Sequence, residues 1–205
     1  MNVTLPAWQG MWQALGAARA DEALFRKLVA AWSEPQRHYH TLLHLRECLA
    51  TAEAARQCAR RPAEIAHALW FHDAVYDPTR TDNEQRSADW ARASIAAAGL
   101  DSALGDRIHA MVMATRHDVL SSDPDTQLLV DADLATLAAP PERYAQYGEQ
   151  IRLEYQHVPQ DEFRARRQRI LEGFLQRPAI YATAHFHAAL EQRARANMIA
   201  EIARL

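Results

Sequence analysis

The amino-acid sequence predicts an all-α fold, and three observations lead to this expectation. Apolar residues recur at spacings of three and four along the whole chain, as they do on the buried faces of helices. Glycine is limited to six residues, and no run shows the sustained alternation that is typical of strands. We therefore expect one compact domain over residues 1–205, built as a bundle of about eight to ten helices.

Turn-forming residues divide the first half of this bundle. The separators are "SEPQR" at 33–37, Pro62 and "DPTRTDN" at 77–83. Proline starts or stops a helix, and clustered Ser, Asp and Asn favour turns. These signals predict helices over residues 8–17, 20–32, 38–60, 62–76 and 83–98.

Similar signals divide the second half. Gly99, "SSDPD" at 121–125 and "APP" at 139–141 separate the apolar stretches there. They predict helices over residues 102–117, 125–138, 141–156, 160–176 and 179–204. No internal repeat and no low-complexity linker divides the chain, which favours a single domain rather than two.

The charge distribution argues against two classes of partner. The net charge is −3, and the basic residues, all arginines except Lys27, are interleaved with acidic ones. A nucleic-acid polymer or a membrane surface would favour a basic stripe instead. We expect neither as a partner.

The cysteines and the N-terminus favour a cytoplasmic protein. Cys48 and Cys58 lack the spacing of a zinc site and are interpreted as free thiols in a reducing compartment. The first fifteen residues have no basic segment followed by a continuous apolar core, and no stretch of 18 apolar residues occurs.

Three segments carry ionisable groups on faces that packing alone would fill with leucine. His40 and His44 are four residues apart, so a helix over this segment would present both on one face. His72 ends an apolar helix and is followed directly by Asp73, while Asp133 lies among apolar residues further along. A lone buried histidine is more often a satisfied core residue, but the combination favours a site.

A divalent cation explains this combination. Burying a carboxylate without a partner costs several kcal/mol, and a metal ion supplies the compensating charge. Two imidazoles and two carboxylates suit Mn, Fe, Co, Ni or Zn better than Ca. We expect one divalent transition metal.

Four motifs in order resemble a known family. "YHTLLH", "WFHDAVYD", "DNEQRSA" and "DADLATL" resemble the HD-domain superfamily of metal-dependent phosphohydrolases, in particular the subgroup of predicted metal-dependent HD phosphohydrolases. "IRLEY" at 151–155 and "EQRARAN" at 191–197 are similar to that subgroup as well. The resemblance covers the chain from about residue 32 onward and implies an HD-domain-like fold.

The resemblance implies site residues. By this likeness His44, His72, Asp73 and Asp133 are the metal ligands. The "YHxxxH" pattern also resembles cyclic-nucleotide phosphodiesterases, in which the first histidine is a general acid and the second a ligand. That similarity assigns His40 to proton donation, with metal binding by both histidines as the alternative.

Two further residues are catalytic candidates. Glu84 follows the His-Asp doublet, where some HD nucleotidases position the attacking water with a carboxylate; helix capping by Asp82 or Asn83 is the structural alternative for this segment. His117 lies in the interval where HD proteins with two metals have extra histidines. A single such histidine favours one metal.

Arg37, Arg152 and Tyr155 are candidates for binding a substrate phosphate, because guanidinium groups bind phosphate oxygens in pairs. Most arginines of the chain are expected to be solvated. Trp70 and Phe71 are expected in the core rather than as a stacking platform.

The function expected from these residues is hydrolysis of a small phosphoester by a metal-activated water. A nucleotide or another phosphomonoester is the expected substrate, and a homo-oligomer is compatible with this picture. Two alternatives stay open: an HD-type di-iron oxygenase, and a metal-retaining regulatory or ligand-binding module without turnover.

Overall fold

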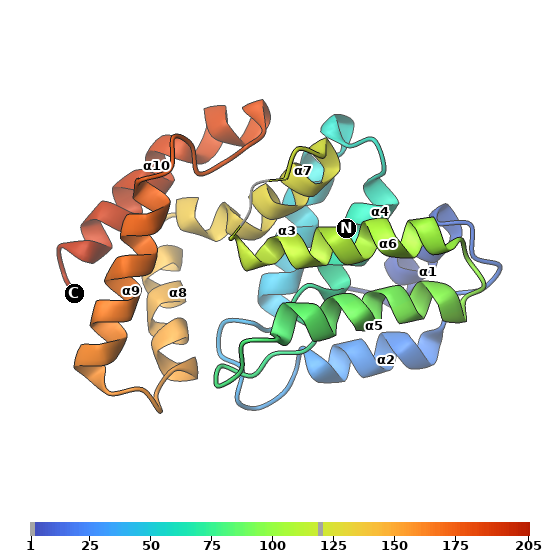
Figure 1. The fold of residues 1–205 in the computed structure, drawn as a ribbon, viewed down its shortest axis with the longest axis horizontal. Helices are drawn as coiled ribbons and strands as arrows, with labels where there is room; N and C mark the ends of the chain where they lie inside the picture. The colour runs from blue at the N-terminus through green and yellow to red at the C-terminus, as the bar shows by residue number, and fades with distance from the viewer. Residues whose placement is uncertain (1–2, 119–120) are drawn as a thin grey trace. The chain divides into compact units, whose positions relative to one another are not determined.

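The computed structural model describes residues 3–118 and 121–205. This part of the chain forms ten α-helices and three short 3-10 helices and contains no strand (Figure 1). The prediction of an all-α fold with eight to ten helices is confirmed. By their internal contacts the residues group into two units, Met1–Asp133 and Leu134–Leu205. The expected single domain over the whole chain stays a prediction.

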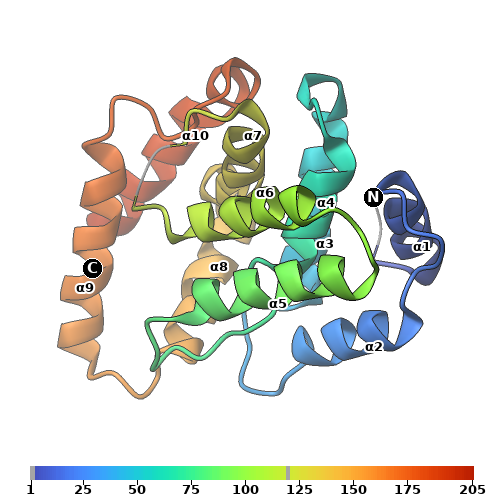
Figure 2. The ribbon, with the colours of Figure 1, turned by 45° about the vertical axis from the view of Figure 1, so that its right-hand side comes forward.

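The first unit is organised around a buried central helix. Its elements are α1 (Leu5–Ala14), α2 (Glu22–Ala31), α3 (Leu42–Ala54), η1 (Arg56–Cys58), α4 (Pro62–Phe71), α5 (Asn83–Ala97), α6 (Ser102–Met113), η2 (Ala114–Arg116) and α7 (Pro124–Asp133). Helix α4 packs against α1, α3, α5, α6 and α7, while α5 and α6 lie side by side (Figures 1 and 2). Every residue of α4 from Glu64 to Phe71 is buried, as expected of a helix surrounded by others.

Large aromatic side chains form the core beside α4. Trp70 and Phe71 are fully buried, which confirms that they belong to the core. Trp8 of α1 packs edge-on against Trp70 with ring centroids 5.1 Å apart. The indole N–H of Trp32 donates to the Trp70 carbonyl at 3.0 Å, so this buried polar group is satisfied.

Two expected helix boundaries are wrong, and both lie at the candidate site. The helix predicted from residue 38 begins at Leu42, because Thr41 adopts an extended backbone and its hydroxyl accepts from the Leu43 N–H at 3.3 Å. The helix predicted to reach residue 76 ends at Phe71, with His72 as its C-cap. Both the "YH" pair and the His-Asp doublet therefore flank helices.

Other helix ends differ from expectation as well. The helices predicted to end at 60, 117 and 138 finish in the 3-10 segments η1, η2 and η3 (Leu134–Ala138). The turn after α5 was predicted correctly, because Gly99 has a φ of +70° there. Asp82 occupies the N-cap position of α5, but its carboxylate accepts from the Arg80 guanidinium at 2.6 Å instead of capping the helix.

The second unit contains η3 (Leu134–Ala138), α8 (Pro141–Glu154), α9 (Gln160–Leu175) and α10 (Ala184–Ile202). Helix α10 packs against η3 and α9. Asn197 of α10 donates to the carbonyls of Leu137 and Ala139, both at 2.9 Å. Glu191 accepts from the backbone N–H of Ile180 at 3.0 Å. The "EQRARAN" segment thus contributes polar contacts that hold the backbone of this unit.

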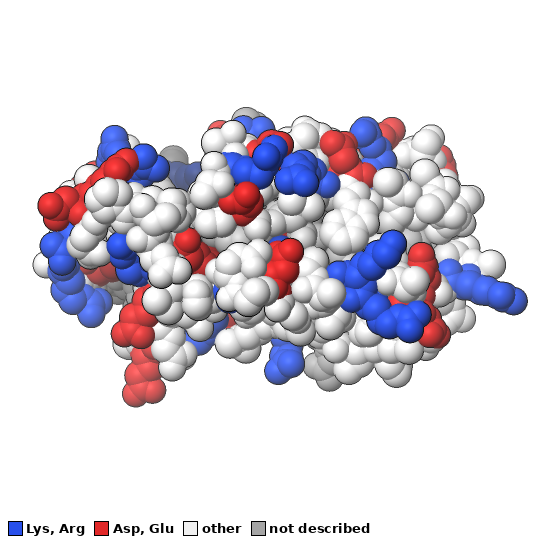
Figure 3. Space-filling view, turned by 90° about the horizontal axis from the view of Figure 1, so that it is seen from below, with Lys and Arg blue, Asp and Glu red and all other residues white. Residues whose placement is uncertain are grey.

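Basic and acidic side chains lie close together on the face drawn in Figure 3, which agrees with their interleaving in the sequence. Exposed pairs of opposite charge include Arg92 and Asp89, which lie 2.9 Å apart. Among the described helices, none combines the length and the apolar character needed to cross a membrane.

Candidate metal centre

The end of α4 presents His72 in a form suited to metal binding. Its Nδ1 lies 2.8 Å from the Leu69 carbonyl oxygen, and a carbonyl can only accept a hydrogen bond. The Nδ1–H must therefore be the donor of this bond, which leaves the lone pair of Nε2 facing away from the helix. Metal-ligating histidines commonly have their second nitrogen fixed in this way.

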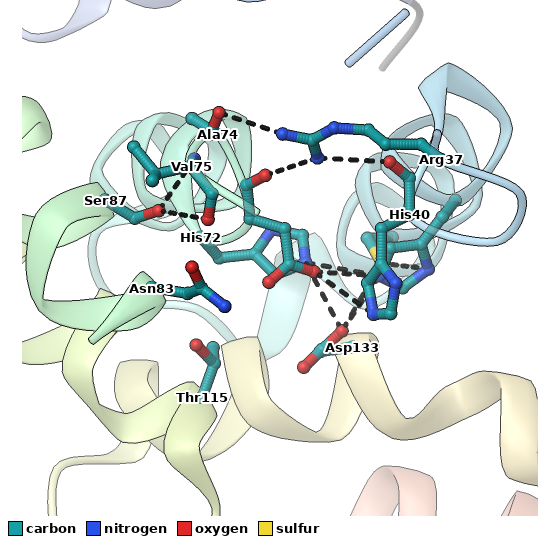
Figure 4. Close-up of polar contacts among 12 residues, drawn as sticks. Arg37, His40, His72, Ala74, Val75, Asn83, Ser87, Thr115 and Asp133 are labelled. Atoms are coloured by element: carbon teal, nitrogen blue, oxygen red, sulfur yellow. Dashed lines mark hydrogen bonds and ion pairs between the residues drawn. The ribbon is translucent and has the colours of Figure 1, made fainter. Parts of the chain in front are cut away.

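Three further groups converge on this nitrogen. The Nε2 of His44, from α3, lies 3.2 Å from His72 Nε2. Asp133, the last residue of α7, has its Oδ1 3.2 Å from His44 Nε2 and 3.4 Å from His72 Nε2. Asp73 Oδ2 lies 3.1 Å from His72 Nε2 and 3.8 Å from His44 Nε2. Figure 4 shows Asp133 pointing at His72 from a different helix.

The spacing of these four atoms is that of donors around one ion. Ligands held at about 2.1 Å from a metal lie roughly 3.0 Å apart at a right angle and about 3.4 Å apart at the tetrahedral angle. The observed separations of 3.1 to 3.8 Å begin just above the right-angle value and include the tetrahedral one. The geometry therefore fits a cation coordinated by two nitrogens and two oxygens.

A thiol that the sequence did not predict belongs to the same group. His44, Cys48, His72 and Asp133 each offer one donor atom, all within 4.8 Å of one another, and together could hold a metal ion. Cys48 Sγ lies 3.6 Å from His44 Nδ1 and 4.0 Å from Asp133 Oδ1. Its position four residues after His44 on α3 was the available signal.

Burial and charge set the protonation of the group in the absence of a cation. Burial lowers the pKa of His44. It also opposes charge on His72, but Asp73 and Asp133 outweigh it and raise that pKa well above its usual value. Burial alone would raise the pKa of both carboxyls, but the imidazoles beside them, His72 foremost, hold both below their usual range.

His40 lies beside this group but outside helix α3. Its Nε2 is 3.9 Å from Asp73 Oδ2, and its ring stacks on Tyr76 with centroids 4.0 Å apart. The expectation that His40 and His44 share one helical face is wrong, since Thr41 begins the helix after His40. The turn still brings His40 to the site.

His117 approaches Asp133 from η2. Its Nε2 lies 3.3 Å from Asp133 Oδ2, the carboxylate oxygen opposite the one that faces His44 and His72. Among the described residues other than glycine, His117 has the one positive φ, 59°. A left-handed backbone at a bulky residue is uncommon and occurs preferentially at functional sites.

Exposure distinguishes two sides of the centre. The side chains of His72 and His44 are 1% and 3% exposed, and those of His40 and His117 are 17% and 21% exposed. The centre is therefore more accessible to solvent from the side of His40 and His117.

The remaining predicted residues have other surroundings. Arg37 is buried and donates to backbone carbonyls beside the site. Glu84 lies in the first turn of α5, next to Asn83, which Figure 4 draws near His72. In the second unit, Arg152 donates to the carbonyls of Tyr155 and Val158 at 2.7 and 3.0 Å. Roles for these residues toward a substrate stay predictions.

Comparison of the chain with protein-family models, curated proteins and solved structures found no match.

Proposed function

We propose that this protein is a metal-dependent phosphohydrolase of the HD type, acting on a small phosphoester such as a nucleotide or another phosphomonoester. The observation that carries this proposal is the convergence of His44, His72, Asp73 and Asp133 at the spacing of metal ligands. The likeness of the surrounding motifs to HD phosphohydrolases supports the same reading.

The donor set fits a divalent transition metal. Two carboxylates balance the charge of a divalent cation, and two imidazoles add neutral donors, so the filled centre would be electrically neutral in a largely buried setting. A metal bound by these residues would supply Lewis-acid activation of water and of a phosphoryl oxygen.

His40 is the group we assign to proton donation. It lies on the more exposed side, where a leaving oxygen would be, and the ring of Tyr76 holds its imidazole in place. Asp73, 3.9 Å away, attracts the protonated imidazole electrostatically. In this role His40 would transfer its proton to the oxygen that leaves the phosphorus.

His117 is assigned to orienting Asp133. The imidazole Nε2 contacts Oδ2 and leaves Oδ1 directed at His44 and His72. Such outer contacts fix the orientation of a ligating carboxylate. This use requires one metal only, in agreement with the expected cofactor.

Metal analysis combined with a phosphatase screen tests the proposal. Protein purified without chelator should contain about one transition metal per chain, and Asp73→Ala should lose it. With Mn, Co or Ni added and oxygen excluded, the protein should release phosphate from at least one member of a nucleotide panel. Bound metal without turnover of any ester would favour a regulatory module, and oxygen-dependent turnover would favour an oxygenase.

A further inference from the structure

Arg37 lies in the connection between α2 and α3, and its side chain is fully buried, with 0% exposure. A cationic side chain is costly to bury unless hydrogen bonds satisfy it. The contacts of its guanidinium therefore indicate what it does. A guanidinium exposed to solvent would be needed for the substrate-binding role that the sequence suggested.

The guanidinium connects the backbones of two site residues. One nitrogen, Nη1, donates to the carbonyl of Asp73 at 2.7 Å and to the carbonyl of His40 at 3.2 Å. The other terminal nitrogen donates to the Ala74 carbonyl at 3.1 Å, and Nε pairs with Glu34 at 2.9 Å. Figure 4 shows Arg37 spanning the space between the His40 segment and the end of α4.

Aromatic rings hold the guanidinium from the sides. Its central carbon lies 5.5 Å from the ring centroid of Trp32 and 5.4 Å from that of Tyr76. The same Tyr76 ring stacks on the His40 imidazole. Arg37, Tyr76 and His40 are thus linked by both hydrogen bonds and ring contacts.

We infer that Arg37 is a positioning residue, which sets the distance between the His40 imidazole and the Asp73 carboxylate and does not bind substrate. These two side chains are 3.9 Å apart but come from separate segments of the chain. A single nitrogen that bonds both of their carbonyls fixes the two backbones relative to each other. The expected effect on hydrolysis rests on the proposed function, whereas the positioning of His40 and Asp73 by Arg37 does not.

The test compares Arg37→Met and Arg37→Lys with two controls. Glu34→Gln removes the negative charge from the partner of Arg37 that lies outside the site. Arg107→Met breaks a two-bond ion pair with Glu64 away from the site and controls for a general loss of stability. Lysine has one nitrogen and cannot reproduce the geometry of a guanidinium that bonds three carbonyls.

Three measurements are expected to agree. Arg37→Met should lower the affinity for Co²⁺ or Zn²⁺ by about ten- to a hundredfold, the usual range for residues that orient ligands, and Arg37→Lys should fall in between. For hydrolysis, kcat should fall while KM changes little. In NMR spectra of the metal-free protein, the His40 ring signals should lose the upfield shift that stacking on Tyr76 causes. Neither control should reproduce these effects.

The outcomes separate this inference from the proposed function. Wild-type protein that binds metal without hydrolysing any ester contradicts the proposed function, while the affinity and NMR comparisons still decide the role of Arg37. A raised KM with unchanged kcat, metal affinity and His40 signals overturns the inference and favours a phosphate ligand. If Arg37→Met does not fold, the same measurements on Arg37→Lys decide the question. An Arg37→Lys variant that matches the wild type in all three measurements overturns the inference.

Discussion

Helix α7 carries two aspartates with opposite surroundings. Asp125, near its start, is fully buried and accepts from the Arg60 backbone N–H at 2.7 Å and the Arg61 guanidinium at 2.9 Å. Asp133, at its end, faces the imidazoles of His44 and His72. The first carboxylate is compensated by an arginine that is always charged. The second is surrounded by groups that become neutral donors when a cation binds.

Helix α4 repeats this contrast with histidines. His67 is buried, contacts Ser94 Oγ at 3.2 Å and stacks on Phe71, and burial lowers its pKa to about 3. His72 lies five residues later between two carboxylates, which raise its pKa despite burial. Each helix therefore has one buried ionisable group outside the candidate centre and one that belongs to it.

The largest expected effect tests the two aspartates of α7 against each other. Asp133→Asn should abolish tight metal binding and hydrolysis, because an amide cannot balance the charge of a cation. Asp125→Asn should keep the metal but lower the free energy of unfolding by about 2 kcal/mol, since it weakens a buried charged hydrogen bond. Calorimetric titration and urea denaturation measure the two quantities. If Asp125→Asn loses the metal and Asp133→Asn keeps it, the assignment of the two aspartates is wrong.

The next effect separates the exposed side of the centre from the buried one. His40→Ala should retain the metal and lower the rate of hydrolysis by a factor of about 10² to 10⁴, the usual contribution of a general acid. Metal content and single-turnover rates of the same preparation provide the comparison. If the metal is lost as well, His40 is a ligand and not the acid.

A smaller effect concerns His67 and acid stability. The pKa of His67 is about 3 in the folded protein and about 6.5 in the unfolded chain. Between these two pH values the unfolded chain binds a proton at His67 and the folded protein does not. The contribution of neutral His67 to the free energy of unfolding is fully present above pH 6.5 and is lost as the pH falls toward 3. By pH 5 this loss amounts to about 2 kcal/mol. Denaturation of wild type and His67→Phe between pH 7.5 and 5 should give a flatter pH dependence for the variant. Equal slopes would refute the assignment.

The smallest effect is expected at Cys48. Its sulfur lies 3.6 and 3.7 Å from the two ring nitrogens of His44, so it is not directed at Nε2 alone. Burial, with Asp133 and Asp73 nearby, also raises the pKa of the thiol. We expect Cys48→Ala to change metal affinity less than tenfold. A thiolate charge-transfer band in the Co²⁺ form would instead show that sulfur coordinates the metal.

The sequence predicted the fold class and three of the four residues of the buried cluster, because apolar periodicity and ionisable groups on apolar faces are both readable from residue order. His44, His72 and Asp133 were expected together, and the structure brings them together. The local setting of His40 was not predictable in this way, because one side-chain bond from Thr41 overrides the helical pattern.

Two other features of the site were not predicted from the sequence, for different reasons. Arg37 was expected to bind phosphate, yet its acceptors at Asp73 and Ala74 are 36 and 37 positions further along the chain. Pairing of this kind requires the tertiary arrangement. Cys48 lacks zinc-type cysteine spacing, but its position four residues after His44 places both on one face of α3, which is a signal within the sequence itself.

The left-handed backbone of His117 has a consequence for protein engineering. A non-glycine residue in this conformation costs of order 1 kcal/mol, which glycine does not incur. A library selected for heat resistance alone should therefore enrich glycine at position 117. Such clones would be more stable than the parent and would lack the imidazole that contacts Asp133, so stability gained at this position removes a side chain of the candidate centre.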